Sequence, residues 1–115
     1  MGKPKVLIIE DDLYLQRFFA SVLDDSTTLL QATKLAQAER IFRDHPDLTL
    51  VSTDACIEDD SIDVLPLVST IRQTYQGLII ATSAQLYYRT QLLKSGCDFE
   101  CEKEFLPFLV LSLVL

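Results

Sequence analysis

The stretch KVLIIEDD, residues 5–12, decides the fold class of this chain. Lys5 to Ile9 is a short apolar and β-branched run, as expected of a strand that is buried on both faces. Three acidic residues follow at once, so carboxylates stand at the carboxyl end of that strand. From Leu13 the apolar residues recur at the spacing i, i+3, i+4, i+7, which predicts a helix whose N-terminus the acids favour. The stretch therefore predicts a buried strand that leads into an amphipathic helix.

Further alternations of strand and helix follow along the chain. Apolar or β-branched runs predict strands, and apolar stripes at helical spacing predict helices. The strands are expected at residues 27–32, 48–53, 78–81 and 98–101, and the helices at residues 34–44, 64–71, 86–95 and 105–115. Pro66 is compatible with its helix only in the first turn. This order predicts parallel βαβ crossovers and an α/β fold, with one sheet covered by helices on both faces.

Length and composition narrow the class of protein. The 115 residues suffice for one domain, which we take to span residues 1–115. The net charge of −7 repels nucleic acid and anionic lipid, and no run approaches the roughly 20 apolar residues that a membrane-spanning helix needs. Three cysteines, with neither metal-site spacing nor a secretory signal, favour reduced thiols in the cytoplasm. We therefore expect a cytoplasmic domain that binds neither nucleic acid nor membranes.

Polar residues gather at the carboxyl ends of the predicted strands. In open parallel sheets the ligand crevice lies at that edge, where the strand order reverses. This rule selects Glu10, Asp11, Asp54, Thr82 and Lys103. Three converging carboxylates repel one another unless a cation neutralises them, and a hard, oxygen-rich site suits Mg²⁺. A carboxylate is also a nucleophile toward phosphorus, so this edge is suited to forming an aspartyl phosphate.

Four fragments, in this order and spacing, resemble the receiver domains of two-component response regulators, the CheY-like family. They are KVLIIEDD, HPDLTLV ahead of an aspartate, the Thr-Ser that follows the fourth strand, and SGCDFECEKEF, and the resemblance extends across the whole chain. The resemblance implies a flavodoxin-like, doubly wound, five-stranded parallel sheet in the order 2-1-3-4-5, with helices on both faces. It also implies a signalling phosphoacceptor rather than an enzyme. A histidine kinase or phosphotransfer protein would supply the phosphoryl group, and a downstream effector or a second copy of the chain would respond to it.

The resemblance assigns roles to five positions. Glu10 and Asp11 match the acidic pair that, together with the phosphoacceptor Asp54, holds magnesium. Lys103 matches the lysine that contacts the phosphoryl oxygens, and Thr82 matches the hydroxyl that responds to phosphorylation.

Two of these assignments have a rival nearby. Receivers usually place the acceptor six residues after the proline of the PDL element, and six residues after Pro46 is Ser52. Asp54 needs the smaller insertion before the arginine of the next helix, and it keeps the usual ending of a small hydroxyl residue followed by aspartate. We therefore assign the acceptor to Asp54. At the end of the fourth strand both Thr82 and Ser83 offer a hydroxyl, and we prefer Thr82.

Several elements of the family pattern are altered. The loop ACIEDDSID, residues 55–63, lacks the usual Met-Pro and Asp-Gly elements, Glu104 replaces the proline after the lysine, and Glu100 occupies the position of the aromatic switch residue. These departures favour a second hypothesis, a degenerate receiver that acts as a phosphorylation-independent protein interaction module. A flavodoxin-like enzyme or nucleotide binder is disfavoured, because the chain, with only three glycines, lacks a glycine-rich phosphate loop.

Three other features have plainer interpretations. The acidic run Glu58–Asp60 is expected to be a solvated loop rather than a source of extra metal ligands, and His45 a surface residue rather than a phosphohistidine. The last segment, FLPFLVLSLVL at residues 105–115, is apolar nearly all round. Either a partner subunit or following domain buries it, or the helix is cut short. At eleven residues it is too short to span a bilayer.

Overall fold

The computed structural model describes residues 2–115 and contains a parallel sheet of five strands in the order β2-β1-β3-β4-β5. The strands are β1 (Lys5–Ile9), β2 (Thr28–Ala32), β3 (Leu50–Asp54), β4 (Leu78–Thr82) and β5 (Phe99–Cys101). The helices that alternate with them are α1 (Leu13–Leu23), α2 (Leu35–Asp44), α3 (Leu65–Thr74), α4 (Leu86–Lys94) and α5 (Leu106–Val114), the last preceded by a 3₁₀ turn, η1 (Lys103–Phe105). The predicted flavodoxin-like α/β fold and its strand order are confirmed.

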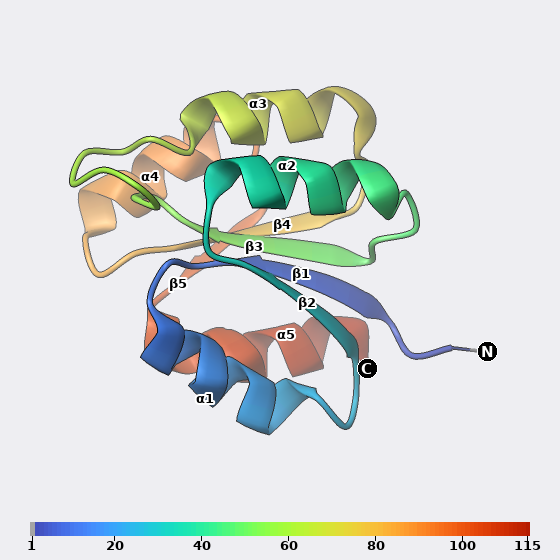
Figure 1. Ribbon diagram of the computed structural model, residues 1–115. Coiled ribbons are helices and arrows are strands. Elements are labelled where there is room, and N and C mark those ends of the chain that lie inside the picture. The colour runs from blue at the N-terminus through green and yellow to red at the C-terminus, as the bar shows by residue number, and fades with distance from the viewer. Residues whose placement is uncertain (1) are drawn as a thin grey trace.

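The helices cover both faces of the sheet, as Figure 1 shows. Helices α1 and α5 lie on one face, and α2, α3 and α4 lie on the other. Each face has its own apolar core: Phe19 and Val110 belong to the first, and Leu67 and Leu92 to the second. Strand β3 lies between these two layers and is buried along its whole length. Its continuous burial explains why the sequence of this strand shows no alternation of apolar and charged residues.

Most boundaries differ by one to three residues from those expected from the sequence, and two of these differences, at the carboxyl edge of the sheet, bear on the site. Strand β3 runs through Asp54 instead of ending at residue 53, because Asp54 still pairs with Thr82 of β4. The last helix begins at Leu106 instead of residue 105, because Lys103–Phe105 form a 3₁₀ turn. Pro107 then falls in the first helical turn, where its missing N–H costs little. Lys103 therefore stands in a tight turn immediately above the edge.

Arg72, near the end of α3, fastens the segments that lead into β4 and β5. Its Nε donates a hydrogen bond to Gly96 O at 3.0 Å, and its Nη1 donates to the carbonyl oxygens of Tyr75 and Gly77. Its Nη2 pairs with Asp98 Oδ2 at 2.8 Å. Gly96 has a φ of +123°, which side chains with a Cβ rarely adopt, so this turn requires glycine. One arginine thus positions the start of two neighbouring strands.

The turn η1 and helix α5 keep apolar side chains on their outer surface. Phe105, Phe108 and Leu115 are all more than half exposed, whereas Leu106 and Val110 are buried. None of the described helices is long and apolar enough to cross a membrane. That a partner or a continuation of the chain covers this surface stays a prediction.

Candidate functional site

Three carboxylates meet at the carboxyl edge of the central strands. Glu10 directly follows β1, Asp11 is the next residue, and Asp54 is the last residue of β3, which neighbours β1. One carboxylate oxygen of each lies within 4.8 Å of the other two. Glu10 and Asp54 are only 1% and 6% exposed, whereas Asp11 is exposed. The cluster is therefore buried on its protein side and reaches solvent through Asp11.

Lys103 supplies a positive charge to this cluster. Its Nζ donates a hydrogen bond to Asp54 Oδ2 at 2.9 Å and lies 2.8 Å from Glu10 Oε1. The contact with Glu10 is an ion pair without hydrogen-bond geometry. Glu10 Oε1 therefore has no hydrogen-bond partner within residues 2–115. A single ammonium group thus serves two buried carboxylates.

Burial and this charge balance together shift the pKa values of Glu10, Asp54 and Lys103. Burial raises the pKa of Glu10 from 4.5 to about 7, an effect that Lys103 reduces and the nearby charge of Asp54 increases. Burial also raises the pKa of Asp54, and Lys103 again opposes the rise. For Lys103, burial by itself lowers the pKa, but the two carboxylates outweigh that effect and the pKa rises. The lysine therefore keeps its charge, while the carboxylates are short of positive charge.

The cluster fits a divalent cation. Glu10 Oε1 is buried, and its ion pair with Lys103 gives it no hydrogen bond within the described part of the chain, so a second cation would add a contact that this oxygen lacks. The oxygens of Glu10, Asp11 and Asp54 form a hard donor set, which Mg²⁺ and similar ions prefer. The exposed Asp11 gives a cation a route from solvent. These are the three residues that the sequence suggested for the metal.

Gln16, which the sequence did not single out, holds the backbone beneath Glu10. Its Nε2 lies within hydrogen-bond distance of the carbonyl oxygens of Ile8, Glu10 and Ala32, at 3.2, 3.0 and 3.2 Å. Gln31 on β2 donates to Gln16 Oε1 at 2.6 Å, so the buried amide has partners on both of its ends. A glutamine at a buried position of an otherwise apolar helix stripe was the signal for this role. Gln16 thus joins α1, β1 and β2 directly under the acidic cluster.

Strand register separates the two candidate phosphoacceptors. Ser52 pairs with Ile8 and Ile80 inside the sheet and is fully buried. Its Oγ has no hydrogen-bond partner in the described chain. Asp54 lies at the end of the strand, where its Oδ1 accepts from the N–H of Ala55 at 2.7 Å and its Oδ2 contacts the lysine. The side chain available at the edge is therefore that of Asp54.

The two candidate hydroxyls after the fourth strand differ in their contacts. Thr82 pairs in register with Asp54, and its Oγ1 donates a long hydrogen bond of 3.3 Å to Thr53 O. Ser83 Oγ accepts from the N–H of Gln85 at 3.1 Å and so stabilises the loop that enters α4. Because residues in register on parallel strands point to the same face, Thr82 is the hydroxyl on the side of the aspartate.

Hydrogen bonds to two of its acidic side chains hold the long loop after Asp54 in place. Asp63 accepts hydrogen bonds from the N–H groups of Ile57 and Glu58, both at 2.8 Å. Glu58 Oε2 in turn accepts from the N–H of Leu35 at 2.9 Å and satisfies the first turn of α2. Glu58 is exposed, as expected, and in addition caps a helix that lies apart in the sequence. Asp59 and Asp60 are exposed, as expected.

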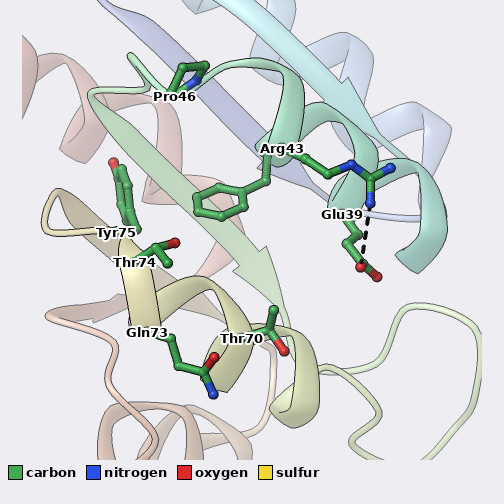
Figure 2. A pocket seen from close by; sticks show the side chains of 8 residues that line it. Glu39, Arg43, Pro46, Thr70, Gln73, Thr74 and Tyr75 are labelled. Atoms are coloured by element: carbon green, nitrogen blue, oxygen red, sulfur yellow. Dashed lines mark ion pairs between the residues drawn. The ribbon is translucent and has the colours of Figure 1, made fainter.

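A groove between α2 and α3 lies away from this edge (Figure 2). Its cavity of about 410 Å³ is lined by Phe42 and Tyr75. The two rings make an edge-to-face contact, with their centroids 5.7 Å apart. It is also lined by Glu39 and Arg43, which form an ion pair at 3.9 Å. Phe42 and Tyr75 lie where both helices end, at the opposite edge of the sheet from the carboxylates. His45 follows α2 at this same end, as predicted, and so is remote from the acidic cluster.

Known proteins resemble this chain in structure rather than in sequence. No family model matches it, and no curated protein does. NtrX from Brucella abortus superimposes with a TM-score of 0.83 at 19% identity, over 98% of this chain and 27% of NtrX. The receiver domain of Ssk1 from Saccharomyces cerevisiae, crystallised with the phosphotransfer protein Ypd1, gives 0.78 at 22% identity over 97% of this chain and 87% of that one. A Burkholderia pseudomallei response regulator with a phosphorylated aspartic acid gives 0.80 at 18% identity, over 98% and 67%. The chain therefore has the fold of response-regulator receiver domains.

Proposed function

We propose that this chain is a receiver domain that accepts a phosphoryl group on Asp54 in two-component signal transduction. The observation that carries the proposal is the placement of the Asp54 carboxylate. It ends a central strand at the carboxyl edge, lies within 4.8 Å of the Glu10 and Asp11 oxygens, and contacts the Lys103 ammonium group at 2.9 Å. Lys103 and a metal ion held by the cluster would neutralise the phosphoryl oxygens while the Asp54 carboxylate attacks phosphorus.

The reaction is a transfer from a phosphohistidine. A carboxylate oxygen of Asp54 attacks phosphorus and forms the new P–O bond, while the P–N bond breaks and the imidazole leaves with its electron pair and takes up a proton. Lys103 and the hydroxyl of Thr82 contact the transferred phosphoryl oxygens. Glu10, Asp11 and Asp54 would hold magnesium, which would supply the further positive charge that this cluster lacks. The chain acts as a phosphoacceptor, with at most self-catalysed phosphorylation and dephosphorylation.

The donor is a histidine kinase or phosphotransfer protein of the cytoplasm. Apolar side chains flank the acidic edge: Leu13 and Tyr14 begin α1 and are 63% and 79% exposed, and Phe105, two residues after Lys103, is 57% exposed. Such a flank suits a protein that must bring a histidine to Asp54. The net charge of −7 argues against nucleic acid or an anionic membrane as the partner. The similar Ssk1 receiver was crystallised with a phosphotransfer protein.

Phosphorylation shifts an equilibrium between two conformations of the surface formed by α4 and β5, and this changes the affinity for a downstream effector or a second copy of the chain. The test of phosphoryl transfer uses the full chain with magnesium and acetyl phosphate. Intact mass should show an adduct of about 80 Da, the mass of one phosphoryl group. The adduct should be lost in Asp54→Ala and kept in Asp59→Ala, which removes an exposed acid from the nearby loop. An adduct that survives Asp54→Ala would refute the assignment.

A second function is a phosphorylation-independent interaction module. The observation that favours it is the loop after Asp54, where hydrogen bonds to Asp63 and Glu58 stand in place of the usual Met-Pro and Asp-Gly elements. Glu104 and Glu100, at positions where the family has proline and an aromatic residue, favour it too. In this case the chain gives no adduct, and Asp54→Ala binds the effector as tightly as the unsubstituted chain.

A further inference from the structure

Arg89 on α4 connects two segments that lie on either side of it. Its Nη1 donates a hydrogen bond to Ser83 O at 3.0 Å, in the loop between β4 and α4. Its Nε lies 3.6 Å from Glu100 Oε1, on β5. The arginine side chain is 12% exposed and that of Glu100 is 31% exposed, so the contact lies partly inside the protein. Arg89 thus bridges the loop after Thr82 and the last strand of the sheet.

The bridge is incomplete on the side of Glu100. A separation of 3.6 Å is too long for a hydrogen bond, and the buried Nε has no hydrogen-bond partner within residues 2–115. A buried guanidinium N–H without an acceptor costs free energy, which a small movement toward the carboxylate would recover. A small movement of the Arg89 side chain toward Glu100 would therefore give its Nε an acceptor.

The backbone connects the acidic edge to Arg89. Ser83, whose carbonyl Arg89 holds, directly follows Thr82, and the hydroxyl of Thr82 makes only a long hydrogen bond of 3.3 Å to Thr53 O. When Thr82 turns to a phosphoryl group on Asp54, the Ser83 carbonyl shifts with it. The guanidinium held by that carbonyl then moves relative to Glu100.

Glu100 lies in a surface that offers apolar contacts. Its neighbour Phe99 is 38% exposed, and Leu86 and Tyr87 in the first turn of α4 are 61% and 66% exposed. A change in the contact between Arg89 and Glu100 shifts α4 relative to β5 and so alters how these three side chains are presented.

We propose that Arg89 is a positioning residue whose ion pair with Glu100 transmits the state of the Thr82–Ser83 loop to the surface of α4 and β5. The inference rests on the proposed phosphorylation of Asp54 and names the contact that carries its effect. Receivers have an aromatic residue at the position of Glu100, so in this chain an electrostatic contact takes the place of a ring.

The test compares Glu100→Gln and Arg89→Lys with the unsubstituted chain. Glu100→Gln keeps the size of the side chain and removes its charge, and Arg89→Lys keeps a charge but cannot hold both partners at once. The matched control is Glu39→Gln, which breaks the exposed ion pair with Arg43 in the groove of Figure 2. Each full-length chain is labelled with ¹⁵N, and its amide spectrum is recorded before and after adding magnesium and beryllium fluoride, a stable mimic of a phosphoryl group. Adduct formation with acetyl phosphate is followed separately by mass.

In the unsubstituted chain and in Glu39→Gln, the mimic should shift the amide signals of Thr82 and Ser83 and also those of Tyr87 and Phe99. In Glu100→Gln and Arg89→Lys the first pair should still shift and the adduct should still form, while the shifts of Tyr87 and Phe99 fall by about half or more. Shifts of undiminished size at Tyr87 and Phe99 in both variants would overturn this inference alone. An unsubstituted chain that gives neither adduct nor shifts at Thr82 would overturn it together with the proposed function.

Discussion

Replacing Glu10 by glutamine removes a buried charge while keeping the size of the side chain. In the metal-free protein the pKa of Glu10 is raised from 4.5 to about 7, chiefly by burial. The folded state therefore holds the proton of this carboxyl more tightly than the unfolded state does. Stability from this group is complete below pH 4.5 and is lost as the pH rises through about 7.

The size of the effect follows from this difference in pKa. At about 1.4 kcal/mol for each pKa unit, ionising Glu10 in the folded protein lowers the free energy of unfolding by about 3 kcal/mol at pH 8. This is a large part of the roughly 5–15 kcal/mol typical of a domain. Glutamine cannot ionise, so Glu10→Gln avoids the loss.

Urea unfolding at pH 5 and pH 8, in the presence of EDTA, measures the difference. At pH 5 the free energies of unfolding of the variant and the unsubstituted chain should differ by less than about 1 kcal/mol, because Glu10 is protonated in the folded state and pH 5 lies close to the 4.5 of the unfolded carboxyl. At pH 8 the variant should be more stable by about 3 kcal/mol. Magnesium at pH 8 should reduce or reverse this advantage, because it stabilises the chain that keeps its carboxylate ligand. If Glu10→Gln in EDTA is no more stable at pH 8 than the unsubstituted chain, the carboxylate carries no burial cost and the reasoning fails.

Three further substitutions test the structure around the site. Ser52→Ala should keep the acetyl phosphate adduct, measured by mass, and leave the free energy of unfolding unchanged or about 1 kcal/mol higher, because it removes a buried hydroxyl without a partner in the described chain. Loss of the adduct would contradict the placement of Ser52 away from the reacting edge. Arg72→Ala should lower the free energy of unfolding by about 3 kcal/mol in urea, because four hydrogen bonds are lost, whereas Ala at the exposed Arg17 should change it by less than about 0.5 kcal/mol. Gln16→Leu should weaken magnesium binding about tenfold by calorimetry, because the Glu10 backbone loses its support; unchanged binding would mean that Gln16 serves only stability.

Much of the fold could be predicted from the sequence because its signals are local. The apolar run of Lys5–Ile9, the acids that end it and the helical spacing after Leu13 are all readable within a few residues. Repeated along the chain, they predict a parallel sheet, and a parallel sheet brings the carboxyl ends of its strands to one edge. The sequence therefore determined which residues share that edge, including Glu10 and Lys103.

The contacts at that edge depend on segments that are far apart in the chain. Only strand pairing decided that Asp54 reaches the edge while Ser52 stays inside, because moving along a buried strand by two residues keeps the face and changes the depth. Only packing brought Gln16 under Glu10, and turned Arg89 toward Ser83 on one side and the β5 carboxylate on the other. The spacing of apolar residues in the sequence indicates which face of a helix or strand is buried. The hydrogen-bond partner of a buried polar atom depends on which other helices and strands pack against that face.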